Sequence, residues 1–168
     1  MNVRFNHINN EPEMLRLLDQ IKDPEVPVLS VLDLGIIRSL SKYDNGYEME
    51  ITPTYSACPA MHMIEMNLKA AFENEGFTPI KIKTILHPPW TTDWMSETGK
   101  QKLKDYGIAP PQYKTNSVDL LNDTPPKITC PICDSDQTER VSEFGSTACK
   151  ALYRCKNCLE PFDYFKCH

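Results

Sequence analysis

Two C-x-x-C pairs near the end of the chain constrain its fold more than any other feature. Cys130 and Cys133 form the first pair, and Cys155 and Cys158 form the second. Each short turn places two sulfur atoms on one side of a tetrahedron, and a second pair completes a four-thiolate site with metal–sulfur bonds of about 2.3 Å. A segment of about forty residues cannot bury a large apolar core, so a metal ion would supply the missing stability. The spacing therefore predicts a small antiparallel ribbon around structural zinc.

Two other uses of these four thiolates stay open. An iron–sulfur site takes the same ligands, and a redox dithiol needs only one C-x-x-C pair. The redox interpretation is the weaker one, because no strand–C-x-x-C–helix pattern surrounds either pair. Cys149, Cys167 and His168 are left over, as spare ligands, as a second site or as side chains packed in a small core. For each of them we favour packing over a second metal.

Charge narrows the classes of partner. The chain has 168 residues, a net charge of -5 and a pI of about 5.4. Such a chain is a poor electrostatic match for nucleic acid or an anionic membrane. No apolar run approaches the roughly 20 residues that span a bilayer, and C-x-x-C pairs in a cytosolic chain favour metal over disulfides. We expect a cytoplasmic protein with no nucleic-acid or membrane partner.

Periodicity places the helices and strands of the preceding region. Apolar spacing predicts helices at residues 11–21, 59–75 and 94–106, and alternation predicts strands at residues 34–43, 47–53 and 79–86. Residues 44–46 (DNG) join the first two strands as a hairpin turn. The expected fold class is a small two-layer α+β (α/β) domain followed by an antiparallel β ribbon. We assign residues 8–107 to this domain, 108–127 to a proline-containing linker, and 128–168 to the ribbon.

The helix expected at residues 59–75 carries three methionines at helical spacing, Met61, Met63 and Met66. Flexible thioether side chains fill irregular gaps in apolar cores, and they also bind soft metals. Core filling explains the three methionines better than a soft-metal site. Glycine at position 76 then ends the helix.

Cys58 stands alone, far upstream of the other cysteines. If the helix begins at Pro59, Cys58 is its N-cap, where free N–H groups and the helix dipole favour a thiolate. The alternative is a small buried side chain that fills the junction between strand and helix. Candidate neighbours in the fold are Asp23, Glu25, Asp33 and His62.

The motifs around Cys58 resemble the MIP18 (DUF59) family. The matching stretches are residues 23–27 (DPEVP), 33–37 (DLGII), 52–54 (TPT), 58–59 (CP), 88–90 (PPW) and 95–96 (MS). The resemblance implies a small α/β domain for iron–sulfur cluster assembly or transfer. It makes Cys58 the characteristic cysteine, with Asp23 and Glu25 in the acidic loop that assists it. Ala57 departs from the glycine that the family often carries there, which leaves the thiol in place.

Motifs in both regions further resemble the D subunits of the bacterial phenylacetyl-CoA epoxidase system. They are residues 88–96 (PPWTTDWMS), 106–111 (YGIAPP), 144–151 (FGSTACKA) and 160–168 (EPFDYFKCH). This resemblance implies a non-enzymatic accessory protein of aerobic phenylacetate catabolism. It would mature an iron–sulfur component, the ferredoxin-type reductase, and its partners would be that reductase and the other subunits. A homodimer is also expected if a transient cluster, or iron, is held at Cys58 across two copies.

Three other functions are open to such a chain. A structural or regulatory subunit would dock on the oxygenase without metal transfer. A catalytic oxygenase subunit is disfavoured, because the sequence has no Glu-x-x-His pair and no Gly-rich nucleotide fingerprint. A nucleic-acid-binding ribbon is disfavoured by charge, since acidic side chains outnumber basic ones in residues 128–168.

Overall fold

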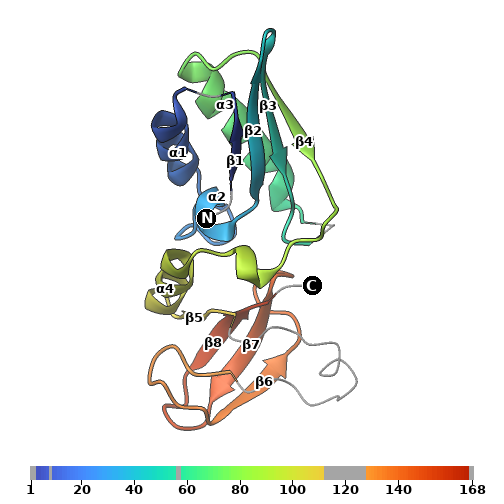
Figure 1. Ribbon diagram of the computed structural model, residues 1–168. Coiled ribbons are helices and arrows are strands. Elements are labelled where there is room, and N and C mark those ends of the chain that lie inside the picture. Colours follow the sequence, from blue (N-terminus) through green and yellow to red (C-terminus); the bar gives the residue numbers. More distant parts are fainter. Residues whose placement is uncertain (1–2, 8, 56–57, 112–127, 167–168) are drawn as a thin grey trace. The chain divides into compact units, whose positions relative to one another are not determined.

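The computed structural model describes residues 3–7, 9–55, 58–111 and 128–166 (Figure 1). The chain divides into two compact units, Met1–Gly99 and Lys100–His168. The first holds a mixed sheet with helices, and the second holds a small sheet and the C-x-x-C pairs. The predicted fold class, an α+β domain followed by a β ribbon, is confirmed.

The sheet of the first unit has the order β1-β2-β3-β4. Its strands are β1 (Arg4–Asn6), β2 (Ile37–Tyr43), β3 (Gly46–Ile51) and β4 (Ile80–Thr84). The outer strands β1 and β4 run parallel to their neighbours, and β2 and β3 form the predicted antiparallel hairpin. Gly46 has a φ of +130°, and a Cβ there would lie 2.3 Å from the carbonyl oxygen of Pro79, so this turn requires glycine.

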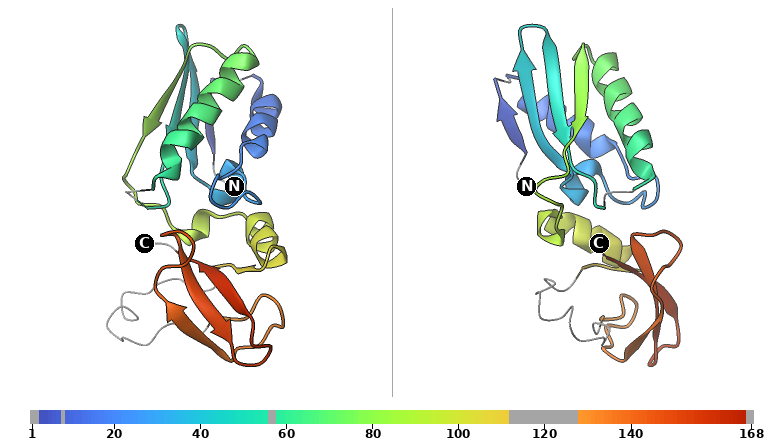
Figure 2. Two further views of the ribbon diagram at one scale, coloured as in Figure 1. Left: turned by 180° about the vertical axis from the view of Figure 1, so that it is seen from behind. Right: turned by 90° about the vertical axis from the view of Figure 1, so that its right-hand side faces the viewer.

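The helices of the first unit are α1 (Glu11–Gln20), α2 (Val31–Leu34), α3 (Ala60–Asn74) and the short 3-10 helix η1 (Thr92–Trp94), and α4 (Glu97–Asp105) runs from the end of the first unit into the second. Seen from behind, α1 and α3 cover the same face of the sheet (Figure 2). The core lies between these layers and includes Leu18, Leu40, Met49, Leu68 and Phe72, all fully buried. Apolar burial therefore holds the first unit together.

The prediction that the three methionines of α3 fill the core is wrong. Met63 and Met66 are 50% and 55% exposed, and Met61 is only partly buried. The buried stripe of α3 is Ala60, Ile64, Leu68 and Phe72. These residues recur every fourth position and form one face of the helix, so Met63 and Met66 fall on other faces.

The second unit has a sheet of order β5-β8-β7-β6. Its strands are β5 (Ile108–Ala109), β6 (Thr138–Ser142), β7 (Lys150–Cys155) and β8 (Pro161–Phe165). Strands β6, β7 and β8 form the expected antiparallel ribbon, and β5 adds a parallel edge. The small core consists of Ala109, Ile128, Cys130, Ala151, Tyr153, Cys155 and Phe162. Two metal-site cysteines are therefore part of the core itself.

The structure differs from the predicted elements in short segments. Strand β1, helix α2 and strand β5 have too few residues to show a period, and they were not predicted. The predicted last helix is split into η1 and α4, because Ser96 caps α4 through a 2.8 Å hydrogen bond from the backbone N–H of Gly99. Ile108 and Ala109 were assigned to the linker and instead pair with β8.

The domain boundaries remain a prediction. Residues 112–127, most of the expected linker, lie outside the described residues. Among the described residues, none of the helices has the length and apolar character that crossing a membrane requires.

Candidate metal and sulfur sites

The four cysteines of the C-x-x-C pairs gather at one point of the second unit. The sulfur atoms of Cys130, Cys133, Cys155 and Cys158 all lie within 4.8 Å of one another. The Cys130–Cys158 and Cys133–Cys155 sulfur pairs are 3.8 and 3.6 Å apart. Four ligands at about 2.3 Å from a tetrahedral zinc ion would be about 3.8 Å apart. The donor set and its spacing thus fit a tetrahedral metal ion.

Two similar turns build this site. Each C-x-x-C pair is followed by a residue with positive φ, Asp134 at +56° and Leu159 at +66°. In the first turn the N–H of Asp134 donates to the carbonyl of Cys130 over 3.0 Å. In the second turn the N–H groups of Asn157 and Cys158 both point at the sulfur of Cys155, at 3.4 Å. Backbone N–H groups therefore face the sulfurs and favour their charged form.

The thiols differ in acidity while they lack a metal. The N–H of Cys158 stabilises the Cys155 thiolate and, with smaller contributions from neighbouring groups, lowers the pKa of Cys155 to about 6. The N–H of Glu160 favours the Cys158 thiolate, but burial and the adjacent thiols outweigh it and raise the pKa of Cys158 to about 12. A metal ion that binds all four as thiolates must therefore displace protons.

Cys149 stands apart from this set. Cys149 is buried, its sulfur lies 3.0 Å from the hydroxyl oxygen of Thr147, and it does not belong to the four-sulfur group. Packing, the interpretation favoured for Cys149, agrees with this position. Cys167 and His168 lie outside the described residues.

Cys58 lies just before α3 rather than at its N-cap. The N-cap is Pro59, and the helix begins at Ala60. Cys58 closes a turn, donating its N–H to the carbonyl of Tyr55 and accepting at its own carbonyl from the N–H of Met61. The N–H groups of Ala60 and Met61 also interact with the thiol. These two backbone donors belong to the free N–H groups of the first helical turn that the sequence predicts beside Cys58.

The carboxylate of Asp23 holds the acidic loop in place through hydrogen bonds to its backbone. One oxygen of Asp23 accepts the N–H groups of Glu25 and Val26, at 2.7 and 2.8 Å. The N–H of Asp23 in turn donates to the carbonyl of Leu29. Asp23 therefore shapes the loop, and both acidic side chains remain partly exposed.

The acidic loop lies near Cys58, and the pKa of the Cys58 thiol is raised rather than lowered as predicted. Burial raises the pKa of the Cys58 thiol, and the negative charges of Glu25 and Asp23 raise it further. The N–H groups of Ala60 and Met61 lower the pKa, as the helix-start argument requires, but they are outweighed. The predicted neighbours Asp23 and Glu25 are thus close enough to act on Cys58, while the predicted lowering of its pKa is wrong.

In the part of the chain that the structure describes, Cys58 has no complete ligand set of its own. Across the described ranges, the only group of three or more close-set metal-binding side chains is the four-cysteine group. His62 is exposed on α3. A metal ion or cluster at Cys58 would therefore need ligands from outside this set of residues.

Asp33 serves the scaffold. Its carboxylate accepts hydrogen bonds from the backbone N–H of Ser30 and from the hydroxyl of Ser96. The hydroxyl oxygen of Ser30 in turn accepts a hydrogen bond from the backbone N–H of Asp33, which caps α2. Gly35 ends α2 with a φ of +67°, and a Cβ there would lie 2.1 Å from the carbonyl oxygen of Trp94. The indole N–H of Trp90 donates to the carbonyl of Leu34. Several motif residues thus tie α2 to the segment before α4, away from any metal chemistry.

Sequence models of two protein families match the chain. Residues 11–75 match the family described as "Iron-sulfur cluster assembly protein". Residues 114–166 match the family described as "PaaD zinc beta ribbon domain". The two matches fall on the regions that contain Cys58 and the C-x-x-C pairs.

Curated relatives extend over most of the chain. The D subunit of an Escherichia coli enzyme named "Putative 1,2-phenylacetyl-CoA epoxidase" is 48% identical over 155 residues, which are 92% of each chain. A "Fe-S protein maturation auxiliary factor" of Porphyromonas gingivalis is 33% identical over 106 residues, 61% of this chain and 97% of that protein.

A solved structure supports the fold of the first unit. The DUF59 domain from Bacillus anthracis aligns with a TM-score of 0.51 at 23% identity, covering 55% of this chain and 90% of that one. At this identity the likeness concerns the fold alone.

Proposed function

The chain belongs to the family of phenylacetyl-CoA epoxidase D subunits, with an iron–sulfur cluster assembly region followed by a zinc β ribbon, and on this premise we propose that it is an accessory maturation protein. Its proposed client is the iron–sulfur component of the multicomponent epoxidase, the ferredoxin-type reductase. In this role the chain is not itself an enzyme. Its cargo is iron or an iron–sulfur cluster, which it delivers to the client.

The observation that carries this proposal is the convergence of Cys58 and the acidic loop. A half-buried thiol with two backbone N–H groups on one side and two carboxylates nearby is suited to bind iron for a short time. The raised pKa keeps the free thiol protonated, so it is protected from oxidation until cargo arrives.

Glu25 and Asp23 have different roles in this proposal. Asp23 uses one oxygen to hold its loop and therefore acts by positioning. Glu25 has the larger charge effect on the Cys58 thiol, and its carboxylate is the better candidate to approach the cargo. Since the described residues bring no group of three or more metal-binding side chains together at Cys58, we propose that two copies of the chain share the cargo.

We assign structural zinc to Cys130, Cys133, Cys155 and Cys158. Four thiolates at tetrahedral spacing suit zinc, which has no redox chemistry and stabilises small domains. Bound zinc would link the two turns and complete the core of the ribbon.

The test measures the client. In cells that carry Cys58→Ser, the epoxidase reductase is purified without oxygen, and its iron and acid-labile sulfide are determined per protein. We expect a clear loss of cluster in the reductase. Cys149→Ser is the matched control, because it makes the same substitution at a cysteine that lies outside the four-sulfur group. A fully occupied reductase in the Cys58→Ser cells would contradict the proposal.

A second candidate function is docking on the oxygenase without metal transfer. The exposed apolar side chains of Met63 and Met66, on the helix that follows Cys58, favour it. This function predicts stoichiometric co-purification with the oxygenase, sensitivity to Met66→Lys, and no effect of Cys58→Ser.

A further inference from the structure

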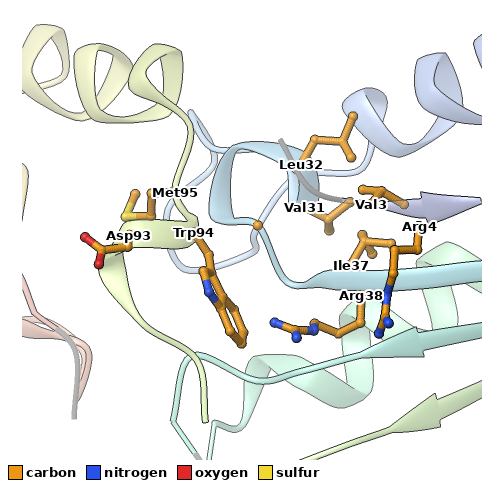
Figure 3. Close-up of a pocket in the computed structure, with 10 residues that line it drawn as sticks. Val3, Arg4, Val31, Leu32, Ile37, Arg38, Asp93, Trp94 and Met95 are labelled. Carbon is orange, nitrogen blue, oxygen red and sulfur yellow. The ribbon is translucent and has the colours of Figure 1, made fainter. Parts of the chain in front are cut away.

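A cavity of about 530 Å³ opens in the first unit, at the junction of β1, β2, α2 and η1 (Figure 3). Its volume lies within the range of about 300 to 1,000 Å³ that is typical of small-molecule sites. Arg4 and Arg38 line one part of it, and Trp94 and Met95 line another. None of these residues belongs to the two sulfur sites.

A β-bulge aims Arg38 into this cavity. Ile37 pairs with Ile51 and Ser39 pairs with Glu50, so Arg38 is an extra residue with no partner in β3. Bulges redirect the side chain of the extra residue. Arg4, on the neighbouring strand, pairs with Ser39; Figure 3 shows the Arg38 side chain reaching toward Trp94, with the Arg4 side chain running at an angle to it nearby.

The two guanidinium groups lie close enough for their positive charges to act on each other. Among the described residues neither forms an ion pair. Burial lowers the pKa of Arg38, the charge of Arg4 lowers it further, and Glu50 only partly opposes them. Glu50 already accepts a 2.7 Å hydrogen bond from the Ser39 hydroxyl, and the carboxylate of Asp93 points away from both arginines (Figure 3). Two adjacent cations without a counter-ion favour the binding of an anion.

The remaining wall of the cavity is apolar apart from Asp93. The guanidinium of Arg38 lies 3.7 Å from the centroid of the Trp94 ring, which fixes it in place by a cation–π interaction. Val31, Ile37 and Met95 supply apolar surface beside it. An anion held by the arginines would therefore have room for an attached ring or short apolar chain.

We propose that this cavity binds a small organic oxoanion, with its carboxylate or phosphate between Arg4 and Arg38 and its apolar portion against Trp94. Arginine pairs bind both kinds of oxoanion through parallel N–H···O bonds. The site is separate from cargo binding at Cys58, so the proposal stands or falls independently of the maturation function.

The test uses the full zinc-loaded chain and three probes: phenyl phosphate, inorganic phosphate and benzyl alcohol. Binding is followed by titration calorimetry and by the NMR signal of the Trp94 indole N–H. We expect phenyl phosphate to bind most tightly, inorganic phosphate to bind more weakly, and benzyl alcohol not to bind. Added salt should weaken the binding of both anions. Benzoate in place of phenyl phosphate then decides whether a carboxylate or a phosphate is preferred.

Arg4→Gln and Arg38→Gln should each weaken binding of phenyl phosphate about tenfold or more. Arg16→Gln is the matched control, since Arg16 is exposed on α1 and does not line the cavity. Arg4 is exposed on an edge strand, so its variant keeps the test decisive if Arg38→Gln disturbs the fold. The proposal is overturned if wild-type protein binds neither anion, if benzyl alcohol binds equally well, or if the Arg4 variant binds like Arg16→Gln.

Discussion

The four-cysteine site and the Cys58 site are both sulfur centres at tight turns, yet their surroundings are opposite. The four late thiols form a closed set within 4.8 Å, and two of them belong to the core of the ribbon. Cys58 is half-buried beside two carboxylates and has no such set among the described residues. A closed set of four ligands retains its metal, whereas an incomplete set can release it.

The two units also differ in what stabilises them. The first unit buries fully enclosed side chains such as Phe72, Leu68 and Leu40 between sheet and helices. The core of the second unit is a short group that includes Cys130 and Cys155. Metal should therefore be indispensable to the second unit and irrelevant to the stability of the first.

Loss of the metal should have the largest effect. Structural zinc contributes about 10–16 kcal/mol in small zinc domains, so Cys155→Ser should abolish the fold of the second unit. The measurement is zinc content together with the dispersed NMR signals of Tyr153 and Phe162. Cys149→Ser should keep one zinc per chain, and a folded ribbon in Cys155→Ser would refute the dependence on metal.

Truncation of a buried side chain in the first unit should have the opposite effect: stability falls and zinc content stays the same. Phe72 is fully buried and packs against Phe77 with ring centroids 5.8 Å apart. Phe72→Ala should lower the free energy of unfolding of the first unit by about 3–5 kcal/mol and leave zinc content unchanged. Urea unfolding with parallel metal analysis checks both. Zinc loss in this variant would show that the units are not independent in stability.

Gly35→Ala should destabilise the first unit less, by about 2 kcal/mol or more. The added methyl group would meet the backbone oxygen of Trp94 at 2.1 Å, in a left-handed conformation. Gly76→Ala is the matched control: its φ is +82°, but nothing lies within 4 Å, so only the conformational cost remains. Thermal unfolding compares the two, and equal losses would contradict the close approach at Gly35.

The smallest effect concerns the acidity of Cys58. Nearby negative charge disfavours a thiolate, so Glu25→Gln should lower the pKa of Cys58 and shift its alkylation by iodoacetamide to lower pH. In the wild type the same profile should lie above that of an unperturbed thiol, because burial raises the pKa. Peptide mass spectrometry of Cys58 over a pH series measures the profile. Glu73→Gln, at the far end of α3, should leave it unchanged.

Features that depend on residues close together in the sequence could be predicted, and features that depend on tertiary packing could not. Each C-x-x-C pair forms its own turn, so the spacing alone was enough to predict that the four sulfur atoms lie together. The DNG turn was likewise enough to predict the β2–β3 hairpin. The pKa of Cys58 was predicted in the wrong direction, because burial is set by residues distant in sequence.

The exposed methionines of α3 and the arginine-lined cavity also could not be predicted from the sequence. Met63 and Met66 have helical spacing, but only the packing of α3 on the sheet decides which face is buried. The arginine-lined cavity depends on a bulge at Arg38 and on a three-residue strand, neither of which leaves a periodic signal. Asp23 and Glu25 were two of four candidate neighbours of Cys58, and the family resemblance singled them out, since no spacing rule links the two segments.

The edge strand β1 has a consequence for the order in which the molecule assembles. Strands β2 and β3 meet through a tight turn, whereas Arg4 must find Ser39 across the whole of α1 and α2. Closing so long a loop costs more chain entropy than closing a hairpin, so long-range parallel pairings form late. The hairpin should therefore come first during folding, and β1 should dock near the end. The arginine pair would then be completed only when the rest of the sheet is already in place.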